Sequence, residues 1–288
     1  MFDWLKMDIS DRATAEALFK NPLLNFTTLI NESTGELINS KQTAEYENLK
    51  FIIYPSFRVE ITGSLHKYFN GSVHNYNDFS YQDVSKTIMD IEEKFGLDPQ
   101  KVVIRNIEFG VNINTSINPT TIIKKIVSYK GKPFNRMNTF KRPGFGIDIS
   151  LTQYRIKIYN KSLQYQQPDN ILRVEKKLFK MESLQDFQPV TLAKLLNYDL
   201  WFECNSILLS MYNEIIITEE IDVCQISKAE RKVYEFGNNP RNWEALTKRR
   251  RHYYKNRFQA IIQKYRGRGY KDEVEELISK KGFQLLGM

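Results

Sequence analysis

Three glutamates, a tyrosine and a lysine on predicted strands could together cut a DNA strand: Glu60, Glu108, Glu175, Tyr159 and Lys161. Clustered carboxylates are hard ligands for Mg²⁺ or Mn²⁺, and such an ion polarises a phosphodiester and neutralises the charge that develops on it. A tyrosine beside the ion can attack phosphorus, and a neighbouring lysine lowers the cost of the phenolate or stabilises the transition state. The product would be a phosphotyrosyl bond to DNA, which conserves the energy of the cut strand.

The alternation of apolar and polar residues predicts that these five side chains share one face of a sheet. Within residues 107–113 the odd-numbered positions are apolar and the even-numbered positions are polar, which is the period of a strand with one buried face. Residues 57–63, 154–161 and 171–179 alternate in the same way. If these strands are neighbours, the three carboxylates, the tyrosine and several cations meet on the surface opposite the core.

Each of these residues also has an ordinary structural interpretation. An exposed glutamate on a sheet is usually solvated or paired with a lysine or arginine of the next strand. Tyrosine is common in strands because it packs well there, and the chain has 16 tyrosines. His66 and His74 are each more typical of loop hydrogen bonding than of a metal site. One residue at a time, the pattern does not choose between the two interpretations.

The remaining periodicities predict an α+β fold, with residues 1–185 forming an antiparallel sheet with helices on one face and residues 186–288 forming a helical, basic region that binds DNA. Further strands are expected at 3–9 and 49–54, and a basic loop with glycine and proline at 130–143. Helices are expected over 11–19, 80–95, 119–129, 191–213, 227–236, 240–264 and 272–281.

Positive charge is concentrated near the C-terminal end of the sequence. The chain has 42 Lys and Arg against 34 Asp and Glu, and residues 228–288 alone hold 16 of the former and seven of the latter. Residues 241–271 contain 11 basic residues and one acid, Glu244, with six aromatic residues between them. Such a segment favours phosphate binding, with aromatics available for base stacking. A solvated helix whose aromatics face a core is the alternative.

Composition excludes several classes of protein. At 41% hydrophobic and 26% charged residues the chain is typical of a globular protein. Its two cysteines, Cys204 and Cys224, are too few for a disulfide scaffold and match no metal-ligand spacing, which favours a reducing compartment. The sequence has neither a basic-then-apolar leader nor an apolar window of about 20 residues. We therefore expect a cytoplasmic protein that is neither secreted nor associated with a membrane.

Short motifs in order along the chain resemble those of rolling-circle replication initiators, the group that includes filamentous-phage replication nickases and the plasmid replication-initiation-factor family. RIKIYNK at 155–161 and LRVE at 172–175 are similar to the group's tyrosine-x-lysine and arginine-x-glutamate strands. Residues 58–75 resemble its glutamate strand and following loop, and residues 105–109 its arginine-x-x-acid strand. Like these relatives, the chain lacks a histidine-hydrophobe-histidine motif. It departs from them at residues 162–164, where relatives often have a glutamate.

The resemblance implies an HUH-endonuclease-like fold that nicks origin DNA for a phage, plasmid or mobile element in a bacterial host. It implies Tyr159 as the nucleophile, Lys161 beside the scissile phosphate, and Glu108, Glu175 and Glu60 as ligands of Mg²⁺ or Mn²⁺. The implied partners are origin DNA, single-stranded or duplex, and a host helicase. The predicted DNA contacts are Lys67, Asn75, Arg173, Arg249, Arg250, Arg251, Lys255 and Arg257.

Three alternatives stay open from the sequence. A mobilisation or conjugative relaxase would use the same chemistry on a different site. A non-catalytic origin-binding protein would bind DNA without forming an adduct. A metal-dependent nuclease that activates water would still cut when Tyr159 is replaced by phenylalanine.

Overall fold

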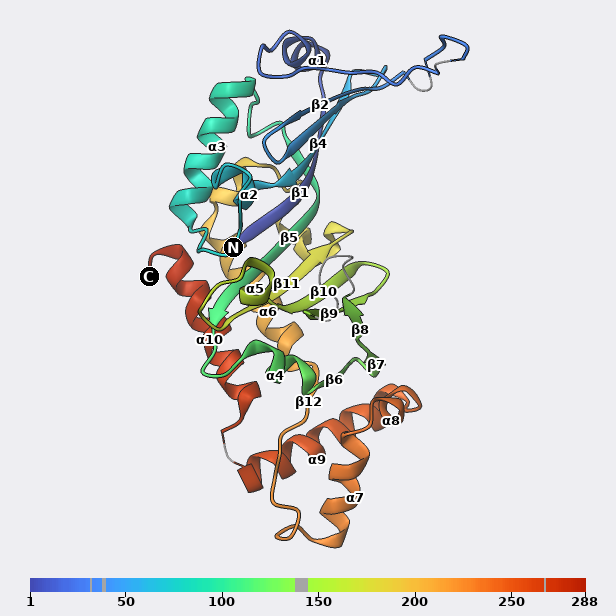
Figure 1. The fold of residues 1–288 in the computed structure, drawn as a ribbon, viewed down its shortest axis with the longest axis vertical. Helices are drawn as coiled ribbons and strands as arrows, with labels where there is room; N and C mark the ends of the chain where they lie inside the picture. The colour runs from blue at the N-terminus through green and yellow to red at the C-terminus, as the bar shows by residue number, and fades with distance from the viewer. Residues whose placement is uncertain (32, 38–39, 138–144, 267) are drawn as a thin grey trace.

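A nine-stranded antiparallel sheet is the centre of the computed structural model, which describes residues 1–31, 33–37, 40–137, 145–266 and 268–288 (Figure 1). Its strand order is β2-β3-β4-β1-β5-β11-β10-β9-β8. The bounds are β1 (Phe2–Ser10), β2 (Gln42–Tyr46), β3 (Leu49–Ile53), β4 (Arg58–Ser64), β5 (Val103–Asn114), β8 (Asn135–Met137), β9 (Gly146–Ser150), β10 (Tyr154–Asn160) and β11 (Ile171–Leu178). The predicted α+β fold with an antiparallel sheet is confirmed.

Three long helices cover the apolar face of this sheet: α3 (Tyr81–Phe95), α6 (Tyr198–Asn213) and α10 (Tyr270–Leu286). The ring of Trp201 in α6 meets Phe2 of β1 edge-on at 5.0 Å between ring centres. Residues that the alternation assigns to the core, such as Phe109 and Val174, are fully buried under these helices. The opposite face of the sheet carries the polar set.

The C-terminal helices divide between two hydrophobic cores. Helices α6 and α10 belong to the sheet core, whereas α7 (Lys228–Gly237), α8 (Pro240–Glu244) and α9 (Lys248–Arg266) enclose a separate cluster around Trp243 and Phe258. We call these three helices the α7–α9 lobe; it lies at the lower end of Figure 1. The division into domains at residue 185 stays a prediction. The last helix, α10, nevertheless packs in the core of the sheet and not in the lobe.

A second, three-stranded sheet joins the two cores. Its order is β12 (Ile215–Ile217), β6 (Ile126–Tyr129) and β7 (Lys132–Pro133). Because side chains alternate along a strand, Ile215 and Ile217 enter the sheet core while Ile216 packs in the lobe. Strand β7 and strand β8 occupy part of the predicted loop 130–143, and residues 138–143 of that loop lie outside the described residues.

Several shorter elements complete the chain, and some observed boundaries differ from the predicted ones. The predicted strand 154–161 ends at Asn160, whose side chain caps the next helix by accepting from the Leu163 amide. The predicted helix 240–264 is two helices, α8 and α9, with a turn at 245–247. The short elements are α1 (Arg12–Phe19), α2 (Leu65–Phe69), α4 (Pro119–Lys124), α5 (Lys161–Tyr165), η1 (Met181–Phe187) and η2 (Ala193–Leu196). Within the described part of the chain, no helix combines the length and apolar character needed to cross a membrane.

The placement of α10 on the sheet gives a stability prediction. Ile278 is 0% exposed in the sheet core, so Ile278→Ala should lower the free energy of unfolding by about 2–5 kcal/mol. Lys280→Ala on the exposed side of the same helix should change it by less than about 0.5 kcal/mol. Urea denaturation of the full chain measures both. Equal effects of the two substitutions would mean that α10 is not part of the core.

Candidate active site

Strands β5, β11 and β10 are neighbours, and their register puts the predicted chemistry on one face. Glu108 lies opposite Lys177, Glu175 opposite Lys157, and Tyr159 opposite Arg173. Since partners across an antiparallel pair share a face, these side chains all project on the polar side. Two glycines leave room for them. A Cβ at Gly110 would lie 2.6 Å from the Glu175 Cβ, and one at Gly146 would lie 2.3 Å from the Tyr159 Cβ.

Asp3 is a site residue that the sequence analysis missed. Strand β1 pairs with β5 through Phe2–Phe109 and Leu5–Ile107, so Asp3 and Trp4 together face Glu108. This β-bulge leaves both residues on the polar side, because two residues of one strand oppose one of the other. The signal in the sequence was weak, because the first strand also carries Lys6 and a second acid, Asp8. Whether Asp3 faces the polar side depends on the bulge, and the bulge depends on how β1 pairs with β5. The sequence pattern does not identify that partner strand.

Three buried carboxylates converge at this point, from Asp3, Glu108 and Glu175. One oxygen from each lies within 4.8 Å of the others. Each comes from a different strand of the sheet, β1, β5 and β11 in spatial order. A rigid sheet therefore holds all three ligand atoms in place.

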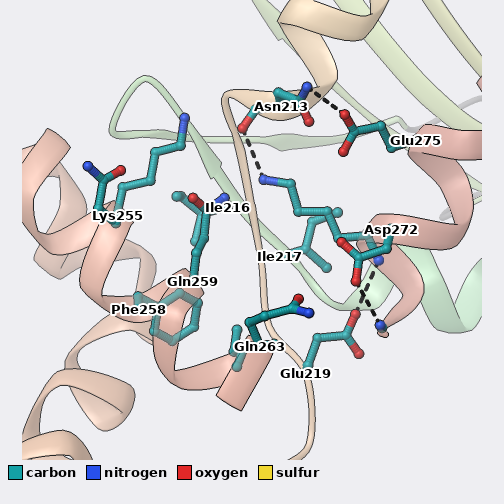
Figure 2. A pocket seen from close by; sticks show the side chains of 14 residues that line it. Asn213, Ile216, Ile217, Glu219, Lys255, Phe258, Gln259, Gln263, Asp272 and Glu275 are labelled. Carbon is teal, nitrogen blue, oxygen red and sulfur yellow. Dashed lines mark hydrogen bonds between the residues drawn. The ribbon is translucent and has the colours of Figure 1, made fainter. Parts of the chain in front are cut away.

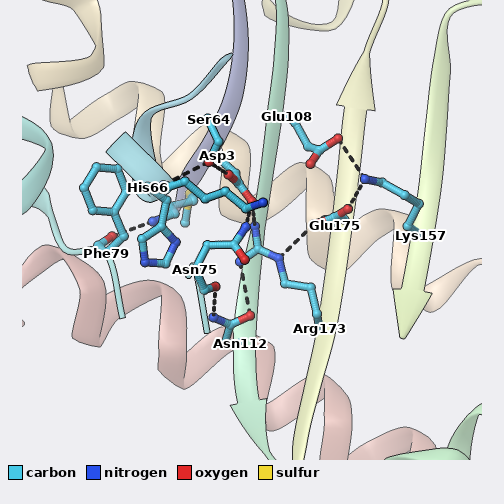
Figure 3. Close-up of polar contacts among 12 residues, drawn as sticks. Asp3, Ser64, His66, Asn75, Phe79, Glu108, Asn112, Lys157, Arg173 and Glu175 are labelled. Atoms are coloured by element: carbon cyan, nitrogen blue, oxygen red, sulfur yellow. Dashed lines mark hydrogen bonds and ion pairs between the residues drawn. The ribbon is translucent and has the colours of Figure 1, made fainter. Parts of the chain in front are cut away.

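Two cations lie between these carboxylates, as Figure 3 shows. The Lys157 ammonium is 3.0 Å from Glu108 Oε2 and also contacts Glu175 Oε1. The Arg173 guanidinium is 2.9 Å from Glu175 Oε2 and 3.4 Å from Asp3 Oδ2. Glu175 is 0% exposed, and cations bind it on both sides. Removing either cation would leave a buried carboxylate uncompensated.

The Tyr159 hydroxyl lies at the edge of this cluster. It donates to Glu175 Oε2 at 3.3 Å and accepts from the Lys161 ammonium at 3.2 Å. The ring is 6% exposed and packs edge-on against Phe145. Lys161 is the first residue of α5, so strand β10 positions the tyrosine and the start of the helix positions the lysine.

A loop from the α2–α3 connection closes over the polar face. Asn75 donates to Asp3 Oδ2 at 2.7 Å and accepts from the Lys161 ammonium at 2.7 Å. Asn112 of β5 holds the loop by donating to the backbone carbonyls of residues 75–77. Asn75 and Arg173, both predicted to contact DNA, are thus buried in the site network. Lys67, the third predicted contact of this region, is half-buried on α2.

Burial and charge shift the pKa values of the carboxylates in opposite directions. Burial alone would raise the pKa of Glu175, but Lys157 and Arg173 hold it well below its usual value. The pKa of Glu108 is raised to about 7 by burial and by the Glu175 charge, which Lys157 offsets only in part. Burial by itself would raise the pKa of Asp3, but the Arg173 and Lys161 charges and the hydrogen bond from Ser64 together lower it. Of the three carboxylates, Glu108 is thus the one that takes up a proton most readily.

The tyrosine and the lysine shift in opposite directions as well. Burial, and then the Glu175 charge, raise the pKa of the Tyr159 hydroxyl well above its usual value. Burial and the Arg173 charge lower the pKa of Lys161 to about 7. Near neutral pH the lysine therefore exists in both protonation states beside a protonated phenol.

The residues present fit a divalent cation. Three carboxylates supply hard oxygen ligands, and one oxygen from each lies within 4.8 Å of the others. Asp3, Glu108 and Glu175 would hold a Mg²⁺ or Mn²⁺ ion. Glu60 is not among them. Its carboxylate is 2.9 Å from the Lys6 ammonium and 3.7 Å from Arg58, so the structure places this predicted ligand in a separate ion-pair cluster.

His66 lies next to the site without joining the carboxylates. Its Nε2 is 2.8 Å from Asn77 Oδ1, and its ring stacks on Phe79. Burial lowers the pKa of His66 to about 3, so the imidazole is neutral at physiological pH. It supports the loop over the polar face, as the ordinary interpretation expected.

The predicted DNA contacts on α9 divide into two groups. Arg249, Arg250 and Arg257 are exposed. Arg251 donates to the carbonyls of Leu246 and Lys130, and Lys255 pairs with Glu214 at 2.7 Å. The last two side chains therefore hold α9 against the rest of the protein.

No protein-family model and no curated protein matches the chain. Among solved structures, its fold is similar to that of a rolling circle replication initiator protein from Geobacillus stearothermophilus, with a TM-score of 0.46 and 12% sequence identity. The match covers 93% of this chain and 97% of that chain. At this identity the similarity is one of overall architecture only.

The ligand set gives a prediction about metal binding. Asp3→Asn and Glu108→Gln should each weaken Mn²⁺ binding by at least about tenfold, which is the smallest loss expected even for a residue that only supports a ligand. Glu60→Gln should leave it unchanged, because that carboxylate lies in another cluster. Calorimetric titration of the full chain with MnCl₂ measures all three. A loss confined to Glu60→Gln would restore the assignment made from the sequence.

The position of Arg173 between two buried carboxylates gives a prediction about stability. Arg173→Met should lower the free energy of unfolding by about 3–5 kcal/mol, because two buried carboxylates lose their shared partner. Arg155→Met is the matched control on strand β10. Its guanidinium is 40% exposed and pairs with Asp148, so its loss should cost about 1 kcal/mol or less. Urea denaturation distinguishes them, and equal losses would contradict the central place given to Arg173.

Proposed function

We propose that this chain is a replication initiator that nicks origin DNA and keeps the cut strand as a 5′-phosphotyrosyl intermediate. The observation that carries the proposal is the position of the Tyr159 oxygen, 3.2 Å from Lys161 Nζ and 3.3 Å from a carboxylate of the candidate metal site. A nucleophile, a proton acceptor and a group of metal ligands thus meet at one atom. A buried structural tyrosine needs a hydrogen-bond partner, but it does not need a lysine and a group of metal ligands together.

The proposed reaction is a transesterification with balanced bonds. The Tyr159 oxygen forms a bond to phosphorus as the bond between phosphorus and the 3′ oxygen breaks, so no bond energy is lost to water. The phenol proton passes to the neutral form of Lys161, and the leaving 3′ oxygen takes up a proton from solvent water. The free 3′ hydroxyl can then prime synthesis. After the proton transfer, Lys161 is a cation beside the phosphate.

The remaining residues of the site have supporting roles in this proposal. A Mg²⁺ or Mn²⁺ ion held by Asp3, Glu108 and Glu175 would supply polarisation of the phosphodiester and neutralise the developing charge. Arg173 keeps two of these carboxylates ionised and oriented. Asn75 orients Lys161 toward the tyrosine oxygen. Arg173 and Asn75 are thus positioning residues in this proposal, not direct DNA contacts.

Access to the site requires movement. Because the Tyr159 side chain is 6% exposed, a DNA strand can reach its oxygen only when part of the surrounding structure opens. A single strand is a better substrate than a closed duplex, since an unpaired phosphodiester can enter a narrow opening alone. The origin DNA, a host helicase and a cytoplasmic setting in a bacterial host remain part of the proposal.

The test is formation of a covalent adduct. Wild type mixed with Mn²⁺ and single-stranded DNA of the element that encodes the protein should give a protein–DNA band on a denaturing gel. Tyr159→Phe should give none, because it lacks the attacking oxygen. Tyr165→Phe is the matched control: its hydroxyl bonds to Asn75 at 2.8 Å, close to the site, and its loss should preserve the adduct.

Other outcomes would support the alternatives. Cutting by both wild type and Tyr159→Phe without an adduct would indicate a nuclease that uses water. DNA binding with neither cutting nor adduct would indicate a non-catalytic binding protein. An adduct formed at a transfer origin instead of a replication origin would indicate a relaxase.

A further inference from the structure

Helix α9 contains eight lysines and arginines and no acidic residue. Half of these cations bind other parts of the protein: Arg251 bonds two carbonyls, and Lys255, Lys264 and Arg266 pair with glutamates. The other four are exposed, and among the described residues none has an acidic partner: Lys248, Arg249, Arg250 and Arg257. The uncompensated charge is thus concentrated in the N-terminal half of the helix.

The exposed face of α9 combines these cations with side chains suited to reading bases. Phe258 and Ile261 face the core of the lobe, while Arg249, Tyr253 and Asn256 are exposed. Their spacing of four and three residues puts them along one side of the helix, opposite the core. Tyr253 is 53% exposed, and Arg257 donates to its hydroxyl at 2.8 Å. Arginine and asparagine are the side chains that bind guanine and adenine edges bidentately.

The lobe has the connectivity of a helix-turn-helix unit. Helix α8 is followed by a three-residue turn at 245–247 and then by α9. Trp243 of α8 is 0% exposed and meets the Phe258 ring of α9 edge-on. Helix α7 crosses α9 so closely that a Cβ at Gly237 would lie 2.1 Å from the Phe258 ring. In such units the second helix of the pair lies in the major groove, with its N-terminal residues at the base edges.

A basic hairpin lies beside the N-terminal half of α9. Strands β6 and β7 are joined at Lys130 and Gly131, which have φ angles of 49° and 80° as a tight hairpin turn requires. The Arg251 guanidinium binds the Lys130 carbonyl and so fixes this turn to α9. Lys132 is exposed next to it. A groove of about 630 Å³ runs between the turn and α9, and its lining includes Lys130, Lys248, Arg251, His252 and Lys255.

The base of the lobe is anchored to the sheet domain around a smaller cavity of about 270 Å³ (Figure 2). Glu219 pairs with Arg266 of α9 at 3.0 Å and accepts from the backbone amide of Lys271 in α10. The Lys271 ammonium donates to the carbonyls of Asn213 and Ile215. The polar groups named here are thus bonded to one another. These contacts fix the direction in which the free face of α9 points.

We propose that the α7–α9 lobe and the β6–β7 hairpin form a sequence-reading site for duplex DNA. Helix α9 lies in the major groove with Arg249, Asn256 and Arg257 at base edges, while Lys132, Lys248 and Arg250 contact the flanking phosphates. The inference rests on the proposed function, to which it adds how the origin is recognised: the lobe reads a duplex, and the buried site acts on a single strand.

The test is selection of duplexes from a pool with a randomised centre, by the full chain in EDTA so that no strand is cut. Wild type should enrich a defined sequence. Asn256→Ala and Arg257→Ala should weaken binding to it by about 5- to 150-fold and relax the preference at one or two positions. Lys132→Ala with Lys248→Ala should weaken all duplexes alike and reduce the salt slope by about one for each lysine removed.

The matched control is Lys280→Ala, which removes an exposed lysine from α10 and should change neither affinity nor preference. Circular dichroism melts check that each exposed substitution leaves the fold intact. Retention of sequence and affinity by Arg257→Ala and Asn256→Ala, or equal competition by single strands, would overturn the inference. An adduct at Tyr159 together with that result would leave the proposed function standing. Selective duplex binding through α9 with no adduct would instead support the reading site and contradict the proposed nicking.

Discussion

The fixed position of Glu175 between Lys157 and Arg173 is the constraint on which the candidate site depends. A fully buried carboxylate is stable only if cations and donors surround it, and here both cations come from the same two strands that carry the tyrosine and the glutamate. Arg173 also reaches Asp3, so the first strand of the chain is tied to the centre of the sheet through charge as well as through backbone pairing. The network therefore couples the geometry of the site to the register of β1, β5, β11 and β10.

The same burial sets the protonation states of Tyr159, Lys161 and Glu108 in the candidate site. It raises the pKa of Tyr159 and lowers that of Lys161 to about 7, so a protonated phenol faces an amine that can accept its proton. Together with the Glu175 charge, it also leaves Glu108 partly protonated near pH 7. Catalytic sites commonly depend on such opposed shifts of neighbouring groups.

The sheet core and the core of the α7–α9 lobe are separate, but one small sheet joins them. The small sheet of β12, β6 and β7 contributes one set of side chains to the sheet core and the alternate set to the lobe, so neither core is closed without it. Cations of α9 divide accordingly. Those at its buried side, such as Arg251 and Arg266, bind carbonyls or glutamates of neighbouring elements, and the exposed ones remain available. Total positive charge thus says less about DNA binding than the fraction that the fold leaves uncompensated.

The sequence by itself determined the α+β class, the polar and apolar faces of the strands, and the grouping of Glu108, Glu175, Tyr159 and Lys161, because period-two alternation is a local property. Only the tertiary structure decided that Asp3 joins the site and Glu60 does not, since that depends on a bulge in β1 and on which cations lie nearby. It also decided that α10 packs in the core of the sheet, and that Asn75 and Arg173 are buried. Those outcomes follow from pairing and packing between distant segments, which no local pattern encodes.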